Sequence, residues 1–237
     1  MTRRSARAAL WAASVCAAAA IATTAVIAGI PTPRDASATV VIGASISQGY
    51  RATAGHDWPS LVERAGDAAA RGCQLVNRSI SATRLLESSP DLPSSLSRLQ
   101  EDALSIPGVR RVILTDVIND IQAVPHEYSA DDILAGIRHF AEKAHAAGVL
   151  TAVTTLTPFG GFDRWDPAGE QTRVDVNAAL RSGRIAGVDV IDFDAVLADP
   201  ADPTRILPAF DSGDHLHPND AGQSALADLV GGTAPLC

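Results

Sequence analysis

The sequence has little lysine, few aromatic residues and a low charge content. Lys143 is the only lysine among 237 residues, aromatic residues make up 4% and charged residues 19%. Because no Gly-Lys-Ser or Gly-Lys-Thr tripeptide occurs, the chain has no phosphate-binding loop of the Walker type. The net charge of −8, with no arginine cluster beyond the N-terminus, argues against nucleic-acid binding. Abundant Val, Ile, Leu and Ala argue against disorder.

Histidine is also scarce, and its spacing does not suggest a metal site. The six histidines form no His-Glu-x-x-His motif or comparable metal-binding pattern. We therefore expect neither a metal ion nor another cofactor.

A long apolar run occurs only near the N-terminus. Three arginines precede an apolar stretch over residues 8–30, and Ala-Ser-Ala at 36–38 matches the cleavage pattern of a secretory signal. We predict a signal peptide over 1–38 and a single domain over 39–237. A run of this length also suffices to span a bilayer, so an uncleaved membrane anchor is the alternative. Either way the domain lies outside the cytoplasm, and this segment is the only membrane contact expected.

That location affects how the cysteines are interpreted. Cys73 and Cys237 are the two cysteines of the predicted domain. In an oxidising compartment, two cysteines suggest one disulfide bond. The alternative is two free thiols, one in the core and one at a frayed terminus.

From residue 39 onward, short β-branched runs alternate with helical patterns. Strands are predicted over 39–43, 74–77, 109–114, 149–156 and 188–193, and helices over 58–70, 93–104, 129–148, 170–181 and 219–230. Five short strands separated by helices predict an α/β fold, a three-layer α/β/α sandwich around a five-stranded parallel sheet. Ligands of such sheets bind beyond the carboxyl ends of the strands.

Polar motifs follow three of these strands and precede the last helix. They are GASISQG at 43–49, NRSISATRLL at 77–86, DVIND at 116–120 and SGDHLHPNDAG at 212–222. In this order they resemble the four sequence blocks of the SGNH/GDSL hydrolase superfamily. The resemblance is closest to the bacterial branch of secreted carbohydrate esterases and lysophospholipase-like enzymes, and it implies a flavodoxin-like SGNH hydrolase fold.

The resemblance implies the chemistry of a serine hydrolase. Ser45 matches the nucleophile, His217 the base that takes its proton, and Asp214 the carboxylate that orients the base. A negatively charged oxygen develops when the serine attacks, and preorganised donors stabilise it. In the family pattern these donors are the N–H of Ser45, the N–H of Ala82 and the side chain of Asn119.

Three positions depart from the family pattern. Ala44 stands where an aspartate follows the first glycine, while Ala82 and Val117 replace glycines in the second and third blocks. None of these changes removes a side chain that performs a chemical step, but together they could reshape the oxyanion loops. The N–H of Ala82 can donate if its backbone conformation tolerates a Cβ.

We expect a monomeric, secreted serine esterase that forms an acyl-enzyme and acts on acetylated carbohydrate or lysophospholipid-type esters. The alternative is a catalytically impaired relative that binds glycan or cell-wall polymer. Simpler interpretations exist for single residues: Ser45 as a turn serine, and Asn119 with Asp120 as a helix-capping pair. His215 and Asp211 lie near the predicted base, but His215 does not have the three-residue offset from Asp214.

Overall fold

The structure is a computed structural model that describes residues 37–122, 128–233 and 236–237. The predicted signal peptide therefore lies outside the described residues, except for Ser37 and Ala38. Ser37 pairs with Cys73, and the N–H of Ala38 donates to Gly108 O at 2.9 Å. These two residues begin the first strand, so cleavage after Ala38 would shorten that strand at its start.

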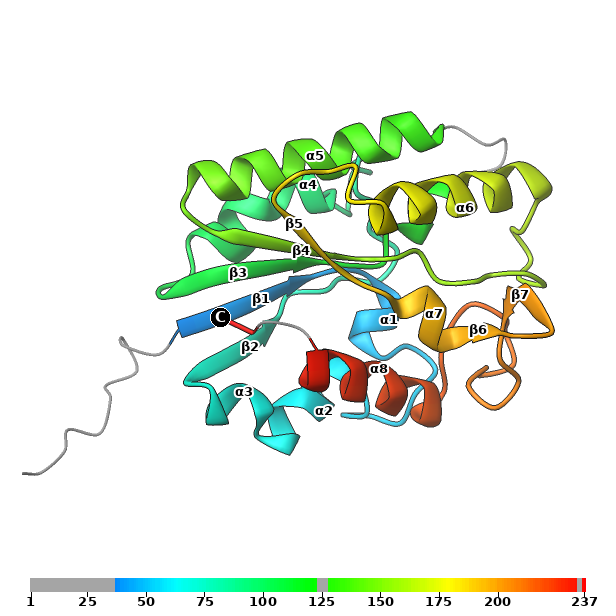
Figure 1. Ribbon diagram of the computed structural model, residues 1–237, viewed down its shortest axis with the longest axis horizontal. Helices are drawn as coiled ribbons and strands as arrows, with labels where there is room; N and C mark the ends of the chain where they lie inside the picture. The colour runs from blue at the N-terminus through cyan, green and yellow to red at the C-terminus, as the bar shows by residue number, and fades with distance from the viewer. Residues whose placement is uncertain (1–36, 123–127, 234–235) are drawn as a thin grey trace, which may run out of the picture. The chain divides into compact units, whose positions relative to one another are not determined.

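A five-stranded parallel sheet forms the centre of the fold (Figure 1). Its strands are β1 (Ser37–Ile42), β2 (Cys73–Asn77), β3 (Val109–Leu114), β4 (Leu150–Thr154) and β5 (Val188–Ile191). Their order is β2-β1-β3-β4-β5, with β1 paired to both β2 and β3. Because the order reverses direction at β1, the carboxyl ends of β1 and β3 flank the switch point where ligands bind in such sheets.

Helices cover both faces of the sheet. They are α1 (Ser45–Gln48), α2 (Trp58–Ala65), α3 (Asp67–Ala70), α4 (Ser95–Leu99), α5 (Ala130–Ala146), α6 (Pro167–Arg181), α7 (Phe193–Leu197) and α8 (Asp220–Thr233). Figure 1 shows α4, α5 and α6 on one face and α2, α3 and α8 on the other. This arrangement confirms the predicted three-layer α/β/α fold with a five-stranded parallel sheet.

The structure differs from the predicted elements at several boundaries. The helix predicted over 58–70 is divided, because Gly66 adopts φ 76° and ends α2. The helix predicted over 93–104 is α4 followed by a π-helical turn, η1 (Gln100–Leu104). A short antiparallel pair, β6 (Ala198–Asp199) with β7 (Asp202–Ile206), was not predicted. Its strands are short, and Pro203 within β7 is unfavourable for a strand.

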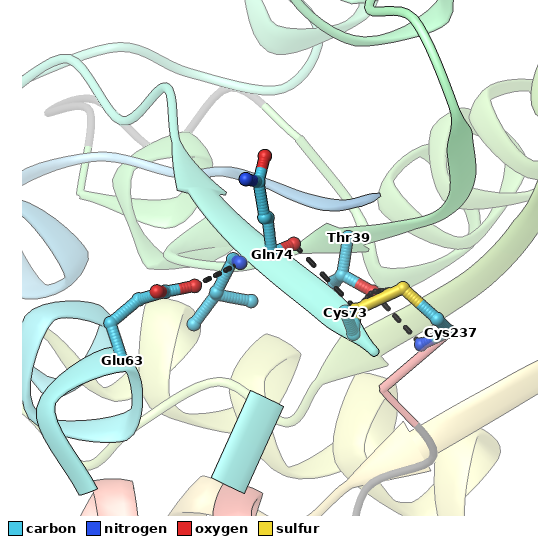
Figure 2. The surroundings of a disulfide bond; sticks show 6 residues. Thr39, Glu63, Cys73, Gln74 and Cys237 are labelled. Carbon is cyan, nitrogen blue, oxygen red and sulfur yellow. Dashed lines mark hydrogen bonds between the residues drawn. A yellow bond between two sulfur atoms is a disulfide. The ribbon is translucent and has the colours of Figure 1, made fainter. Parts of the chain in front are cut away.

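A disulfide bond joins Cys73, the first residue of β2, to Cys237 at the end of the chain (Figure 2). Beside it, Thr39 Oγ1 accepts a hydrogen bond from the N–H of Cys237 at 3.1 Å. Glu63 of α2 accepts one from the N–H of Leu75. The disulfide lies at the start of β2, at the opposite end of the strands from the expected ligand site.

Candidate active site

Ser45 is the first residue of α1 and follows directly after the turn that ends β1. The turn consists of Gly43 and Ala44, and a Cβ at Gly43 would collide with the side chain of Thr115. As the first helical residue, Ser45 has an N–H that takes no part in the hydrogen bonds of its own helix. This N–H is therefore available to a ligand at the carboxyl end of β1.

His217 lies between Ser45 and Asp214. Its Nε2 is 2.9 Å from Ser45 Oγ, and its Nδ1 is 2.7 Å from Asp214 Oδ2. When the proton is on Nδ1, the ring donates to Asp214 and accepts the hydroxyl proton of Ser45. Geometry of this kind allows the imidazole to remove the proton from a serine that attacks an electrophile.

The carboxylate of Asp214 is held in its ionised form. Burial acts to raise the pKa of Asp214, but hydrogen bonds from the backbone and ring of His217 and from the Leu216 N–H outweigh it, so the pKa lies below its usual value. The two backbone N–H groups donate to Oδ1 at 2.9 and 3.1 Å. An ionised Asp214 can stabilise a positive charge on the His217 ring.

Asn119 and Ala82 lie on loops that are linked to the turn before Ser45. Asn119, in the 3₁₀-helix η2 (Val117–Ile121), donates from Nδ2 to Thr83 O at 2.9 Å. Thr83 Oγ1 donates in turn to Gly43 O at 3.2 Å. Hydrogen bonds thus connect all three loops that carry the predicted oxyanion donors.

Asp120 fixes the loop that follows Ala82. It is fully buried, and its two oxygens accept from the N–H groups of Leu85 at 2.7 Å and Leu86 at 3.0 Å. Burial raises its pKa to about 6, although these two amides and the charge of Arg84 act in the opposite direction. Since its partners are on the Ala82 loop, the helix-capping interpretation of Asp120 is wrong.

The sequence of the chain matches a known family. The family described as the GDSL-like Lipase/Acylhydrolase family matches over residues 41–225. The chain belongs to this family. No curated protein matches the chain significantly.

Solved structures share its fold. A GDSL-like lipase from Bacteroides thetaiotaomicron is 17% identical with a TM-score of 0.63, covering 84% of this chain and 88% of that chain. The psychrotrophic esterase EstA from Pseudoalteromonas sp. is 18% identical with a TM-score of 0.58, covering 81% and 93%. Est24, a carbohydrate acetylesterase from Sinorhizobium meliloti, is 15% identical with a TM-score of 0.63, covering 82% and 96%. At these identities, the likeness shows the fold alone.

The two replaced glycines of the GDSL pattern have different structural consequences. Ala82 adopts φ 64°, the left-handed region that glycine occupies readily and that is unfavourable for a residue with a Cβ. Val117 lies in η2 and is absent from the residues with positive φ, so its position needs no glycine. Only the replacement at Ala82 therefore imposes backbone strain.

Tyr50 and Arg51 are close to the site, although no sequence motif pointed to them. The half-exposed Tyr50 ring meets the His217 ring edge to face, with 4.7 Å between the centroids. Arg51 Nε lies 3.5 Å from Asp214 Oδ2, and its guanidinium carbon is 5.5 Å from the centroid of the Tyr50 ring. Their one sequence signal is their position directly after Gly49, which ends α1.

His215 is paired with a different carboxylate. Its Nδ1 is 2.6 Å from Asp211 Oδ2, and Asp211 Oδ1 also accepts from the His215 N–H at 3.0 Å. The structure therefore brings His217, and not His215, to Ser45.

Within residues 37–122, 128–233 and 236–237, no group of three or more His, Cys, Asp or Glu side chains could hold a metal ion. No helix within these ranges combines the length and apolar character needed to cross a membrane.

Proposed function

We propose that this protein is an esterase that hydrolyses carboxylic esters. Ser45 is the nucleophile, His217 the general base and acid, and Asp214 the orienting carboxylate. The observation that supports this most directly is the continuous contact from Ser45 Oγ to His217 Nε2 at 2.9 Å and from His217 Nδ1 to Asp214 at 2.7 Å. No metal ion or cofactor has a part in the proposed reaction.

The reaction would proceed in two halves. Ser45 Oγ bonds to the ester carbonyl carbon while His217 takes its proton, and the alcohol then leaves with that proton as the acyl-enzyme forms. A water molecule gives a proton to His217 and attacks the acyl carbon. The carboxylic acid leaves, and the proton returns to Ser45.

The oxyanion of each tetrahedral intermediate would be bound by three donors. These are the N–H of Ser45, the N–H of Ala82 and the Nδ2 group of Asn119, whose other hydrogen bond to Thr83 O fixes its orientation. Loss of one such donor lowers the rate by roughly 100- to 1,000-fold in serine hydrolases.

A polar pocket beside Ala82 favours acetylated carbohydrate over lysophospholipid as the substrate. The pocket has a volume of about 440 Å³, and Arg84, Glu87 and Ser88 are among its lining residues. Arg84 Nη1 and Glu87 Oε2 form an ion pair at 2.7 Å. Charged and hydroxyl groups of this kind suit a polyhydroxylated alcohol better than an acyl chain. A series of esters of increasing acyl length tests this: we expect a short-acyl optimum, and a long-acyl optimum would favour lipid.

The proposed location is extracytoplasmic, with the protein secreted as a monomer or retained by an uncleaved N-terminal anchor. The Cys73–Cys237 disulfide supports an oxidising compartment. Fractionation of the producing cells, with the mass of the exported chain, separates the cleaved from the anchored form.

Covalent labelling tests the proposed nucleophile. A fluorophosphonate should phosphonylate the wild-type protein, and Ser45→Ala should abolish both labelling and hydrolysis of a short-chain ester while the protein stays folded. A folded wild type that neither reacts with the probe nor hydrolyses any ester would contradict the proposal.

A second candidate is a glycan-binding protein with impaired catalysis, motivated by the left-handed backbone of Ala82 at φ 64°. Ala82→Gly distinguishes the two in a protein of low activity, because of the two replaced glycines only position 82 has a positive φ. A large rate gain indicates an impaired enzyme, whereas glycan binding without any gain indicates a binding protein.

A further inference from the structure

The helix that begins with Ser45 lacks a side-chain cap of its own. Ala44 is its N-cap residue, and a methyl group cannot accept a hydrogen bond. At this position an Asp, Asn or Ser usually accepts from the N–H of the third helical residue, which is Ser47 here. In the family pattern, the residue at this position is an aspartate.

Asp116 supplies the missing acceptor from the turn that follows β3. It is the second residue after β3, and its Oδ2 accepts from the N–H of Ala44 at 2.7 Å and of Ser47 at 2.9 Å. Its Oδ1 accepts from the hydroxyls of Ser47 at 3.2 Å and Thr115 at 2.8 Å. One carboxylate from the turn after β3 thus makes the hydrogen bond to Ser47 that an N-cap aspartate would make.

The surroundings of Asp116 are unfavourable for a carboxylate without these partners. Asp116 is buried, and its burial raises its pKa against the effect of its hydrogen bonds to Ser47, Thr115 and Ala44. Its backbone has φ 59°, a left-handed conformation that Asp tolerates better than most residues do. A buried charge in such a backbone is stable only where donors surround it, and two of its donors are backbone amides of the nucleophile turn.

These contacts lie on both sides of Ser45. The two N–H groups that Asp116 Oδ2 binds belong to the residues at positions 44 and 47, on either side of the nucleophile. The N–H of Ser45 is unpaired because Ser45 is the first helical residue, and the attachment of both flanking amides to one oxygen limits the directions in which it can point. Trp58 Nε1 extends the restraint by donating to Ser47 Oγ at 3.0 Å.

We propose that Asp116, in the turn after β3, is a positioning residue that takes the place of the N-cap carboxylate absent at Ala44. It thereby holds Ser45 in the orientation that attack requires. The kinetic part of this inference rests on the proposed esterase function, whereas the structural part does not. It follows that the turn needs one carboxylate, at position 44 or at position 116. Removing that carboxylate, or adding a second one, disturbs the hydrogen bonds of the same two amides.

A double-variant cycle tests the replacement. The variants are Asp116→Gly, Ala44→Asp and the two combined. Glycine at position 116 adopts φ 59° without strain. We expect Asp116→Gly to lower the rate of fluorophosphonate labelling on the order of 10- to 100-fold, since two buried amides lose their acceptor. The KM for a short-chain ester should stay within about threefold, because Asp116 does not line the substrate pocket beside Ala82.

The combined variant is the decisive member of the cycle. Ala44→Asp alone should lower both the labelling rate and the urea midpoint of unfolding, because two carboxylates then face the same donors. In the Asp116→Gly background, the same change should raise both quantities, regaining about tenfold in labelling rate. Ala44→Val in the Asp116→Gly background adds bulk without an acceptor, and we expect no recovery from it.

The two readouts separate this inference from the proposed function. If the wild type takes up no fluorophosphonate, the esterase proposal fails, and the urea midpoints alone decide the role of Asp116. The inference is overturned if Ala44→Asp fails to raise the midpoint in the Asp116→Gly background. It is also overturned if the wild type reacts with the fluorophosphonate and Asp116→Gly reacts at the same rate.

Discussion

Arg51 competes with His217 for one oxygen of Asp214. Arg51 Nε lies 3.5 Å from Asp214 Oδ2, the same atom that is 2.7 Å from His217 Nδ1. A cation at this distance reduces the negative potential that the carboxylate presents to the imidazole ring. The Arg51 side chain is 54% exposed, so water and salt weaken the effect without removing it.

Replacing Arg51 should raise the rate of catalysis at low ionic strength. In Arg51→Gln, Asp214 stabilises the positive charge that develops on the His217 ring during attack without competition from a cation. We expect kcat/KM for a short-chain ester to rise by about two- to threefold at low ionic strength, and by less in high salt. The measurement is kcat/KM with a short-chain ester at one pH and two salt concentrations.

Arg184→Gln provides the matched control for the charge change. Arg184 forms an exposed ion pair with Asp131 at 3.3 Å, and neither residue contacts the triad candidates. Its kcat/KM should match that of the wild type at both salt concentrations. An equal gain in both variants would attribute the effect to net charge and not to the contact between Arg51 and Asp214.

The free energy of unfolding of the wild type should rise relative to that of Asp120→Asn as the pH falls. Its pKa is about 6 in the folded protein, above its usual value of 3.8, so the folded state binds more protons than the unfolded chain between these pH values. The contribution of Asp120 to the free energy of unfolding therefore increases as the pH falls from about 7 to about 4. Two pKa units correspond to a change on the order of 3 kcal/mol. Urea unfolding of both proteins across this pH range measures the difference.

Asp132→Asn should show the opposite trend. Hydrogen bonds from the side chain and backbone of Ser129 lower the pKa of Asp132, so its stabilising effect is present above the unfolded pKa and is lost on acidification. The wild type should thus lose its advantage over Asp132→Asn as the pH falls. The same sign for both substitutions would contradict the assigned environments.

The sequence predicted those parts of the site that depend on order along the chain. Parallel strands place their carboxyl ends at one edge, so motifs after β1, β2 and β3 had to converge there. His217 could be distinguished from His215 by its offset from Asp214. The N-terminal cap of α5 is likewise local, because Ser129 and Asp132 interact within one turn.

Apart from the suggested Cys73–Cys237 disulfide, contacts between distant segments could not be predicted in this way. Asp116 binds Ala44 only because β3 pairs with β1 in a particular register, which no local pattern encodes. The left-handed backbone of Ala82 is set by its loop, against the preference of alanine. Tyr50 and Arg51 reach His217 and Asp214 only through tertiary packing, so an exposed aromatic and an exposed arginine carried no signal by themselves.

Ala82→Gly should stabilise the protein and change the rate little. Glycine removes the strain of φ 64° but adds freedom to the unfolded chain, so we expect a net gain of up to about 1 kcal/mol. The N–H of Ala82 already has the direction that this backbone imposes, so kcat should change by less than about threefold. Val117→Gly, at a buried position without positive φ, should instead destabilise the protein by more than about 1 kcal/mol. Urea unfolding and ester kinetics of both variants test this pair, and a gain from Val117→Gly would contradict it.

Removing the disulfide should lower stability without altering the chemistry of the site. Cys73 and Cys237 are 164 residues apart, so their bond restricts a large part of the unfolded chain, and the combined Cys73→Ser and Cys237→Ser variant should lose about 3 to 5 kcal/mol. Because the bond lies at the start of β2, away from Ser45 at the end of β1, kcat and KM should stay within about twofold wherever the variant is folded. A reductant should lower the unfolding midpoint of the wild type and leave that of the variant unchanged. A folded variant with much reduced kcat would mean instead that the chain terminus contributes to the geometry around His217.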